Sequence, residues 1–110
     1  MPVDRADAVF GALSDGTRRR LLSLLDERGE ASATDLAREL PVSRQAVVKH
    51  LSTLAAARLV DHRRSGREVL YRPTPAPMSD AVAWMAEVGA QWDGRLAALE
   101  RQIAKNRASA

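Results

Sequence analysis

Apolar residues recur at helical spacing through the first half of the chain. Over residues 4–13 they fall at i, i+3, i+4 and i+7, which predicts a helix whose buried face holds Ala6, Val9, Phe10 and Leu13. Residues 14–17 offer side-chain oxygens that can cap a second helix. This helix is predicted over residues 17–28, with a leucine stripe and a stop at Gly29. The chain therefore begins with two short amphipathic helices.

Two further helices are predicted on either side of Pro41, over residues 33–40 and 44–58, and Ser43 is placed to cap the second of them. At about 100° per residue, this second helix has an apolar side and a polar side. The predicted core side holds Ala46, Val47, His50, Leu51 and Leu54. The predicted exposed side holds Arg44, Gln45, Val48, Lys49 and Ser52.

The pattern then changes to a β-hairpin over residues 59–72, with Ser65 and Gly66 suited to its turn. Prolines at 73, 75 and 77 end the strand pairing, and helical spacing returns over residues 78–105. The predicted order is α-α-α-α-β-β-α, a mainly α fold with a small β-hairpin. Two helices joined by a tight turn and followed by such a hairpin form a winged helix-turn-helix, whose second helix enters the major groove of DNA.

The exposed side of the helix over residues 44–58 carries groups that read base edges. Arginine can bind guanine, glutamine can bind adenine, and an apolar side chain can contact a thymine methyl. Arg44 and Gln45 stand at the N-terminal end, which usually points into the groove. A polar face is also typical of any solvated helix. Val48 favours the groove, because a β-branched apolar residue has no role on a face that meets only water.

Phosphate contacts are predicted from helix starts and from the hairpin. Hydroxyls and free N–H groups at the helix starts suit phosphate oxygens. Several arginines lie close together at the hairpin turn, and nearby phosphates would relieve the repulsion between their charges. A solvated loop can explain any single one of these arginines, but it explains the whole cluster poorly. The predicted DNA-binding set is Ser32, Thr34, Ser43, Arg44, Gln45, Val48, Lys49, Ser52, Arg63, Arg64 and Arg67. Arg18, Arg19 and Arg20 spread around their helix and are expected to form ion pairs with acids instead.

The last predicted helix carries an apolar stripe longer than the body of a small domain can cover. At 1.5 Å per residue it reaches about 40 Å. Part of the stripe can fold back on the first helix, and the rest needs a partner, for which a second copy is the economical choice. The predicted dimer interface holds Val9, Phe10, Leu13, Val82, Met85, Val88, Trp92, Leu96 and Leu99. Trp84 lies off this stripe, and its role stays open.

A two-fold dimer sets two groove-reading helices about 34 Å apart, which fits an inverted repeat in the DNA. Residues 1–110 are then one domain, with a DNA-binding core over 14–72 and dimerisation helices over 4–13 and 78–105.

Composition narrows the functional classes. The 110 residues carry a net charge of +3 and contain no cysteine, which excludes disulfides and thiolate metal sites. No segment has the roughly 20 apolar residues that span a bilayer, and no apolar run follows the N-terminus, so a cytoplasmic protein without a membrane partner is expected. There is no glycine-rich phosphate loop, and neither His50 nor His62 is placed to activate a serine, so an enzyme is not expected.

Three segments together resemble the ArsR (arsenic-repressor-like) family of bacterial winged-helix regulators. They are residues 10–20, which enter the second helix, residues 42–51, and the pair Leu59–Val60 with Gly66, Arg67 and Tyr71 in the hairpin. The resemblance covers almost the whole chain. It implies a homodimer that represses promoters, and many members release DNA when they bind a metal ion. Gly16 stands where the family commonly has proline.

The metal-sensing positions of the family are not filled here. Members that sense soft metals carry two cysteines at the third helix, where this chain has the hydroxyls of Ser32 and Thr34, which are poor ligands for thiophilic ions. The last helix has no histidine, and its acids are well separated. His50 is expected to pack in the core. The expectation is a member without a metal, a cofactor or a recognisable effector site.

The first functional hypothesis is therefore a homodimeric repressor that binds an inverted-repeat operator in double-stranded DNA. The alternative is a winged helix that serves as a protein-interaction module without specific DNA binding. Such modules often lack a basic hairpin, and this chain has one. A steep fall of affinity with salt would distinguish DNA binding from the alternative.

Overall fold

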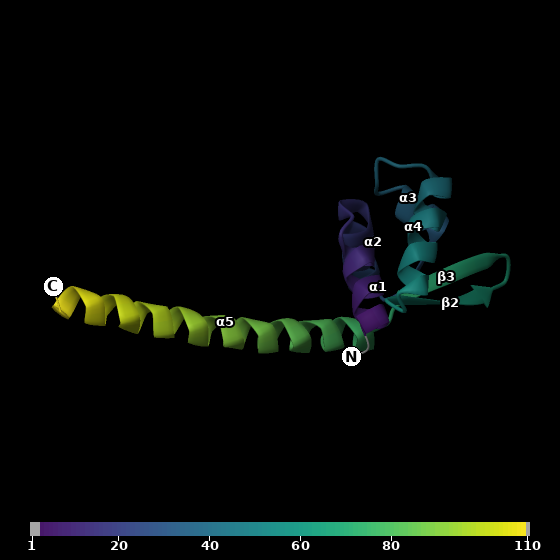
Figure 1. Cartoon of the computed structure of the whole chain (residues 1–110). Coiled ribbons are helices and arrows are strands. Elements are labelled where there is room, and N and C mark those ends of the chain that lie inside the picture. The colour runs from purple at the N-terminus through teal and green to yellow at the C-terminus, as the bar shows by residue number, and fades with distance from the viewer. Residues whose placement is uncertain (1–2, 110) are drawn as a thin grey trace.

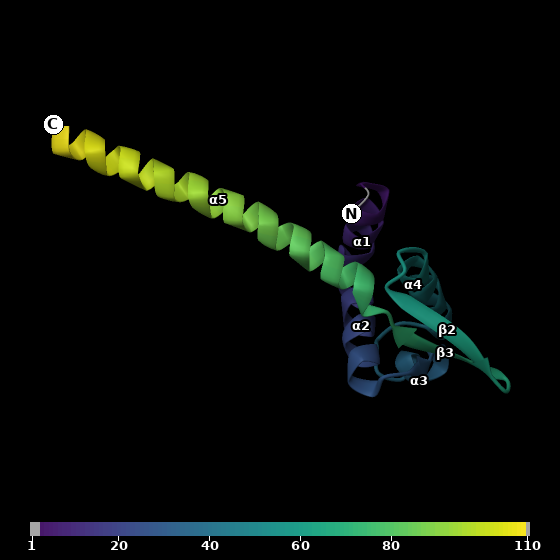
Figure 2. The same cartoon turned by 90° about the horizontal axis from the view of Figure 1, so that it is seen from below.

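The computed structural model describes residues 3–109 of the chain. Five helices and three strands follow one another in this order: α1 (Val3–Leu13), α2 (Gly16–Arg28), β1 (Ala31–Ser32), α3 (Ala33–Ala37), α4 (Arg44–Ala56), β2 (Val60–Ser65), β3 (Glu68–Pro73) and α5 (Pro75–Ser109). The first four helices gather into a small core. The β2–β3 hairpin, called the wing below, and α5 project from opposite sides of it (Figure 1 and Figure 2).

The ends of the short helices are fixed by local hydrogen bonds. The Asp15 carboxylate accepts hydrogen bonds from the backbone N–H groups of Thr17 and Arg18, and Gly29 ends α2 at a φ of 80°. At the end of α4, Arg58 adopts a φ of 61°, a conformation that usually selects glycine. The backbone N–H of Leu59 then reaches back to the carbonyl of Leu54 at 3.0 Å. The chain therefore leaves α4 abruptly and turns into β2.

Two predicted helix ends were placed too late. The third helix ends at Ala37 instead of residue 40, because the chain tightens into a turn in which Glu39 N–H donates to the Leu36 carbonyl at 3.1 Å. The fourth ends at Ala56 instead of residue 58. Both errors fall within one turn of helix, where the sequence pattern gives least guidance.

The predicted hairpin is confirmed, and a third strand joins it. The sheet is antiparallel in the order β1-β3-β2, with Ala31 opposite Tyr71. β1 has only two residues, too few to show an alternating pattern. The turn lies one residue later than predicted, since Ser65 pairs with Glu68 and leaves Gly66 and Arg67 at the tip. Gly66 has a φ of 63°, as expected of the first central residue in a type II′ turn.

The hydrophobic core lies between α1, α2, α3, α4 and the base of the sheet. Its largest fully buried side chains are Leu21, Leu25, Leu36, Leu51, Leu54, Leu59, Val9 and Val47. Val9 is only 1% exposed, and its side chain holds α1 against the helical core. Its predicted place in a dimer interface stays a prediction.

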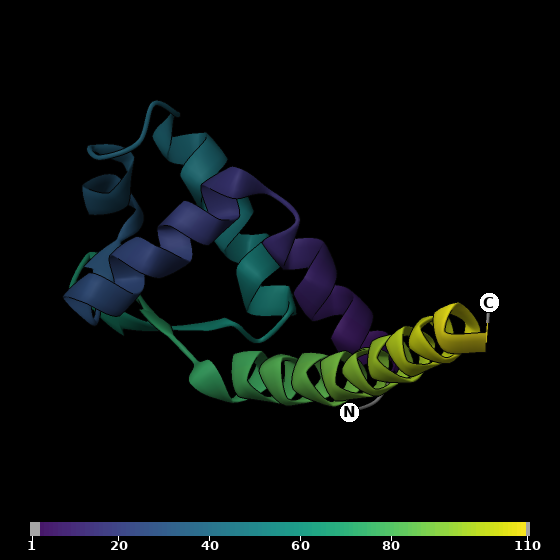
Figure 3. The same ribbon diagram turned by 90° about the vertical axis from the view of Figure 1, so that its left-hand side faces the viewer.

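The last helix is longer than predicted at both ends. It begins at Pro75 instead of residue 78, because Pro75 and Pro77 lie in its first turn, where backbone N–H groups need no helical partner. Ala81 is fully buried at the start of α5. Beyond α1, the helix runs away from the body of the protein (Figure 3), and the chain measures 74 × 29 × 21 Å.

Candidate nucleic-acid interface

The polar side of α4 is open to solvent. Gln45, Lys49 and Ser52 are exposed, and their side chains make no hydrogen bond or ion pair to any residue in 3–109. Ser43 caps the helix, its hydroxyl accepting a hydrogen bond from Ala46 N–H at 3.1 Å. A row of donors and acceptors therefore follows one face of a rigid helix without an internal partner.

A hollow of about 310 Å³ lies where α3, α4 and the wing meet. Thr34, Arg44, Val48, Arg67 and Tyr71 are among the residues that line it. Arg44 Nε donates to Thr34 Oγ1 at 3.0 Å, which orients the guanidinium. In residues 3–109 nothing bonds to its two Nη groups. Five of the eleven residues predicted to bind DNA therefore line one concave surface, and the other six lie outside it: the five are Ser32, Thr34, Arg44, Val48 and Arg67.

The structure gives Val48 a different role from the one inferred above. Its side chain is half-buried and packs against the hydrophobic core. Packing is therefore enough to explain an apolar residue on the polar side of α4, and the argument that Val48 favours the groove does not hold. Part of its side chain still reaches the hollow beside Arg44.

Ser32 was predicted to offer its hydroxyl to phosphate, and in the structure the same hydroxyl caps α3. Ser32 is 5% exposed, and its hydroxyl accepts a hydrogen bond from Asp35 N–H at 3.1 Å as the cap of α3. The neighbouring Thr34 is exposed and remains available. The cap of this five-residue helix uses the Ser32 oxygen as an acceptor, while Ser32 also lines the hollow beside Thr34, and its contact with phosphate stays a prediction.

The wing arginines are not equivalent. Arg63 donates to both carboxylate oxygens of Glu30, at 2.7 and 2.8 Å, so its charge is already paired within the chain. This hydrogen-bonded guanidinium holds the pKa of Glu30 below its usual value, and the carboxylate raises the pKa of Arg63. Arg64 and Arg67 are exposed and have no ion pair within residues 3–109.

Glu30 is a residue that the sequence prediction missed. It lies 33 positions from Arg63, and no local pattern connects the two residues. The pair joins the loop before β1 to the wing, so it restrains the direction in which the wing leaves the core.

Arg18 and Arg19 do not form the ion pairs expected of them. Arg18 donates to the carbonyls of Ala12 and Gly11, and Arg19 donates to that of Leu13. These carbonyls end α1, where the regular helical hydrogen bonds stop, and the carbonyl of Gly11 also accepts from the backbone N–H and hydroxyl of Ser14. The two arginines therefore hold α1 against α2. His50 on α4 is half-buried and contacts Arg18.

The apolar stripe of α5 is exposed along most of the helix. Val82, Met85, Trp92, Leu96, Leu99 and Ile103 are 45–55% exposed, and Val88 is half-buried. Phe10 and Leu13 on α1 are half-buried. The Trp84 ring packs against Phe10 with centroids 5.7 Å apart, which fastens the start of α5 to α1. A continuous apolar surface therefore runs from α1 along α5.

Within 3–109, no group of three or more His, Cys, Asp or Glu side chains is arranged to hold a metal ion. No helix in the described part of the chain is long and apolar enough to cross a membrane.

Comparisons with known proteins agree with this architecture. A family model described as a helix-turn-helix domain matches residues 13–63. The transcriptional repressor SdpR of Bacillus subtilis is 34% identical over 77 residues, which are 70% of this chain and 84% of that protein. The structure of an ArsR-like transcriptional regulator from Rhodococcus sp. RHA1 superposes with a TM-score of 0.77 and 44% identity, covering 89% of this chain and 92% of that one.

A homodimeric winged helix-turn-helix DNA-binding domain from Mycobacterium bovis, a possible ArsR-family regulator, superposes with a TM-score of 0.62 and 28% identity, over 86% of this chain and 83% of that one. One family accounts for the order of elements, for the wing and for the similarity along most of the chain. The chain belongs to the ArsR-like family of winged helix-turn-helix transcriptional regulators.

Proposed function

We propose that this protein binds double-stranded DNA as a symmetric homodimer and represses transcription from a promoter that contains an inverted repeat. The observation that carries the proposal is the unpartnered polar face of α4 beside a wing whose Arg64 and Arg67 are also unpaired in residues 3–109. Gln45, with Arg44 next to it, reads bases in the major groove. Thr34, Lys49 and the wing arginines contact phosphates.

The exposed stripe on α5 supports a second copy as the partner. Six large apolar side chains on one face of a projecting helix are unfavourable in water, and a symmetric partner helix removes them from it. Val82, Met85, Trp92, Leu96 and Leu99 form this interface, with Phe10 and Leu13 at its α1 end. SdpR is named a repressor and the M. bovis domain is homodimeric, which supports the same function here.

The test combines selection of bound sequences from a random duplex pool with affinity measured against salt. Gln45→Ala should lose about 1–3 kcal/mol of preference at one base pair of each half-site. Arg64→Ala should weaken all sequences alike and reduce the slope of log K against log salt by about one. Arg63→Ala should change the slope less than Arg64→Ala, because Glu30 already neutralises Arg63.

Arg101→Ala is the matched control, since Arg101 is exposed on α5 away from both the wing and the apolar stripe. It should leave selection and slope unchanged. No selected sequence, together with an affinity that does not depend on salt, would reject DNA binding and favour the protein-interaction module.

A further inference from the structure

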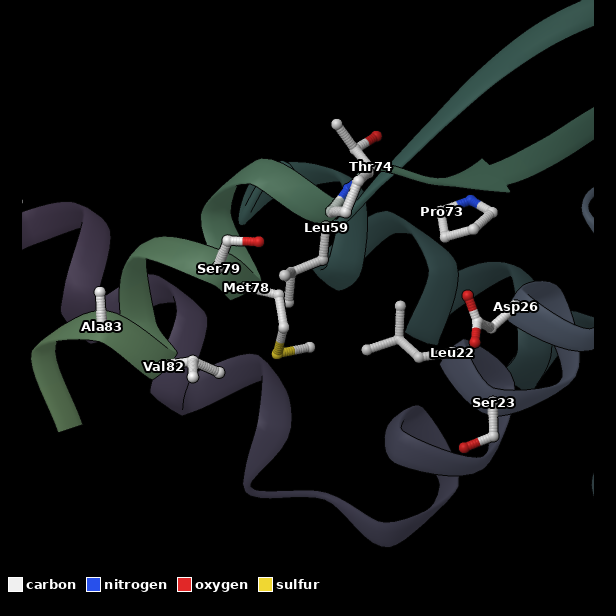
Figure 4. A pocket seen from close by; sticks show the side chains of 11 residues that line it. Leu22, Ser23, Asp26, Leu59, Pro73, Thr74, Met78, Ser79, Val82 and Ala83 are labelled. Atoms are coloured by element: carbon white, nitrogen blue, oxygen red, sulfur yellow. The ribbon is translucent and has the colours of Figure 1, made fainter. Parts of the chain in front are cut away.

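A second cavity shares no lining residue with the hollow between α4 and the wing. It measures about 540 Å³, is open to solvent on one side, and is bordered by α2, Leu59, the end of β3 and the first turns of α5. Leu22, Leu59, Pro73, Met78 and Val82 provide its apolar walls (Figure 4). Its volume falls in the range of about 300–1,000 Å³ that small-molecule sites occupy.

Few polar groups line this cavity, and they differ in charge. Asp26 is the one ionisable residue among the described residues that line it, and three hydroxyl-bearing residues, Ser23, Thr74 and Ser79, complete the lining. In Figure 4 the Asp26 carboxylate points toward Leu22 and Pro73, along the wall. Asp26 forms no ion pair with any residue in 3–109. Asp26 is exposed, so its carboxylate lies at the solvent edge of the apolar wall, and this arrangement is complementary to a cation that carries an apolar body.

We propose that this cavity is a binding site for a small organic cation: a molecule with an apolar body that fills the space between Leu22 and Met78, and one ammonium-type group that pairs with Asp26. Anions are disfavoured by the charge of Asp26. Neutral apolar molecules fit the walls but leave the carboxylate without a partner.

The cavity is placed to let such a molecule act as an effector. Pro73 and Thr74 end the wing, and Met78 and Val82 begin α5, so one occupant contacts both elements. A bound molecule therefore sets the angle between α5 and the wing. This consequence rests on the proposed function, because in a dimer joined through α5 that angle fixes the separation of the two α4 helices.

Calorimetric titration of the full chain without DNA tests the site independently of DNA binding. The probes are 1-naphthylmethylamine, 1-naphthylmethanol and 1-naphthoate, which share one apolar body and differ in charge. We expect the cation to bind most tightly and the anion most weakly. Asp26→Asn should weaken binding of the cation by about two- to fivefold and leave binding of the alcohol unchanged. Ser79→Trp, which fills the cavity from α5, should weaken all three.

Glu27→Gln is the matched control, because Glu27 neighbours Asp26 on α2, is exposed and does not line the cavity. Equal binding of the three probes, or equal effects of the Asp26 and Glu27 variants, would overturn the proposal. So would binding to a monomeric Leu96→Glu variant but not to the wild-type dimer, since the partner copy would then cover the cavity. A DNA titration with and without the cation measures the effector role separately.

Discussion

Arg18 Nη1 lies 3.3 Å from Nδ1 of His50, across the contact between α2 and α4. A guanidinium only donates, so in this hydrogen bond Nδ1 of His50 is the acceptor. The same guanidinium donates to Ala12 and Gly11 at the end of α1. One side chain therefore joins the first helix, the second helix and the predicted DNA-reading helix.

Removing this junction should destabilise the fold. We expect Arg18→Ala to lower the free energy of unfolding by about 1–2 kcal/mol, because partly buried carbonyls at the end of α1 lose a charged donor. Urea denaturation followed by circular dichroism measures it. Arg20→Ala is the control, since Arg20 is exposed, and it should stay within about 0.5 kcal/mol of wild type. Equal losses in the two variants would contradict the role of Arg18.

Substitutions at Ser32 and Thr34 should distinguish a hydroxyl that stabilises the fold from one that contacts DNA. Ser32→Ala removes the cap of α3 and should cost about 1 kcal/mol of stability, with unchanged affinity of the folded protein for DNA. Thr34→Val should leave stability nearly unchanged and weaken DNA binding, because it removes an exposed hydroxyl and the contact that orients Arg44. Denaturation and fluorescence anisotropy with the selected DNA measure the two effects. The reverse pattern would support the original prediction for Ser32.

The Glu30–Arg63 pair predicts a specific pH dependence. The pKa of Glu30 is lowered in the folded state by its hydrogen bonds to Arg63, from an ordinary value of 4.5. A lowered carboxyl pKa stabilises the fold fully above the unfolded value, and this contribution is lost as the pH falls through the folded value. Glu30→Gln should therefore have a lower melting temperature than wild type at pH 7, and the difference should shrink below about pH 4.5 and vanish in stronger acid.

Glu27→Gln controls for the general loss of one exposed acid on the same side of the protein, and its difference from wild type should stay small at every pH. A Glu30→Gln difference that is constant with pH would show that the pair does not supply this stability.

The α5 stripe predicts which substitutions break the dimer. Leu96→Glu places a charge in the proposed interface, where desolvation is costly, and should yield a folded monomer. Ala98→Glu introduces the same side chain two residues along, at an exposed position off the stripe, and should leave the dimer intact. Sedimentation velocity at micromolar concentration distinguishes them. A wild-type protein that sediments as a monomer, or equal effects of both changes, would count against the interface.

The order and type of most elements could be predicted from the sequence, because helical spacing, caps and turn residues act over a few positions. The leucine stripe of α2, the cap at Ser43 and the Gly66 turn are signals of this kind. Local patterns also separated the polar side of α4 from its buried side. Such patterns did not predict the exact helix ends or the two-residue strand β1.

The contacts of each side chain could not be predicted in this way, because they depend on how the elements pack. The sequence pattern identifies Val9 and Val48 as apolar, but whether each is buried depends on which elements pack against it. Glu30 neutralises Arg63 across 33 positions, and Ser32 turns inward because its neighbours in β3 cover it. Charge pairing and burial arise from contacts between segments that are distant in sequence. Local periodicity therefore does not predict these contacts.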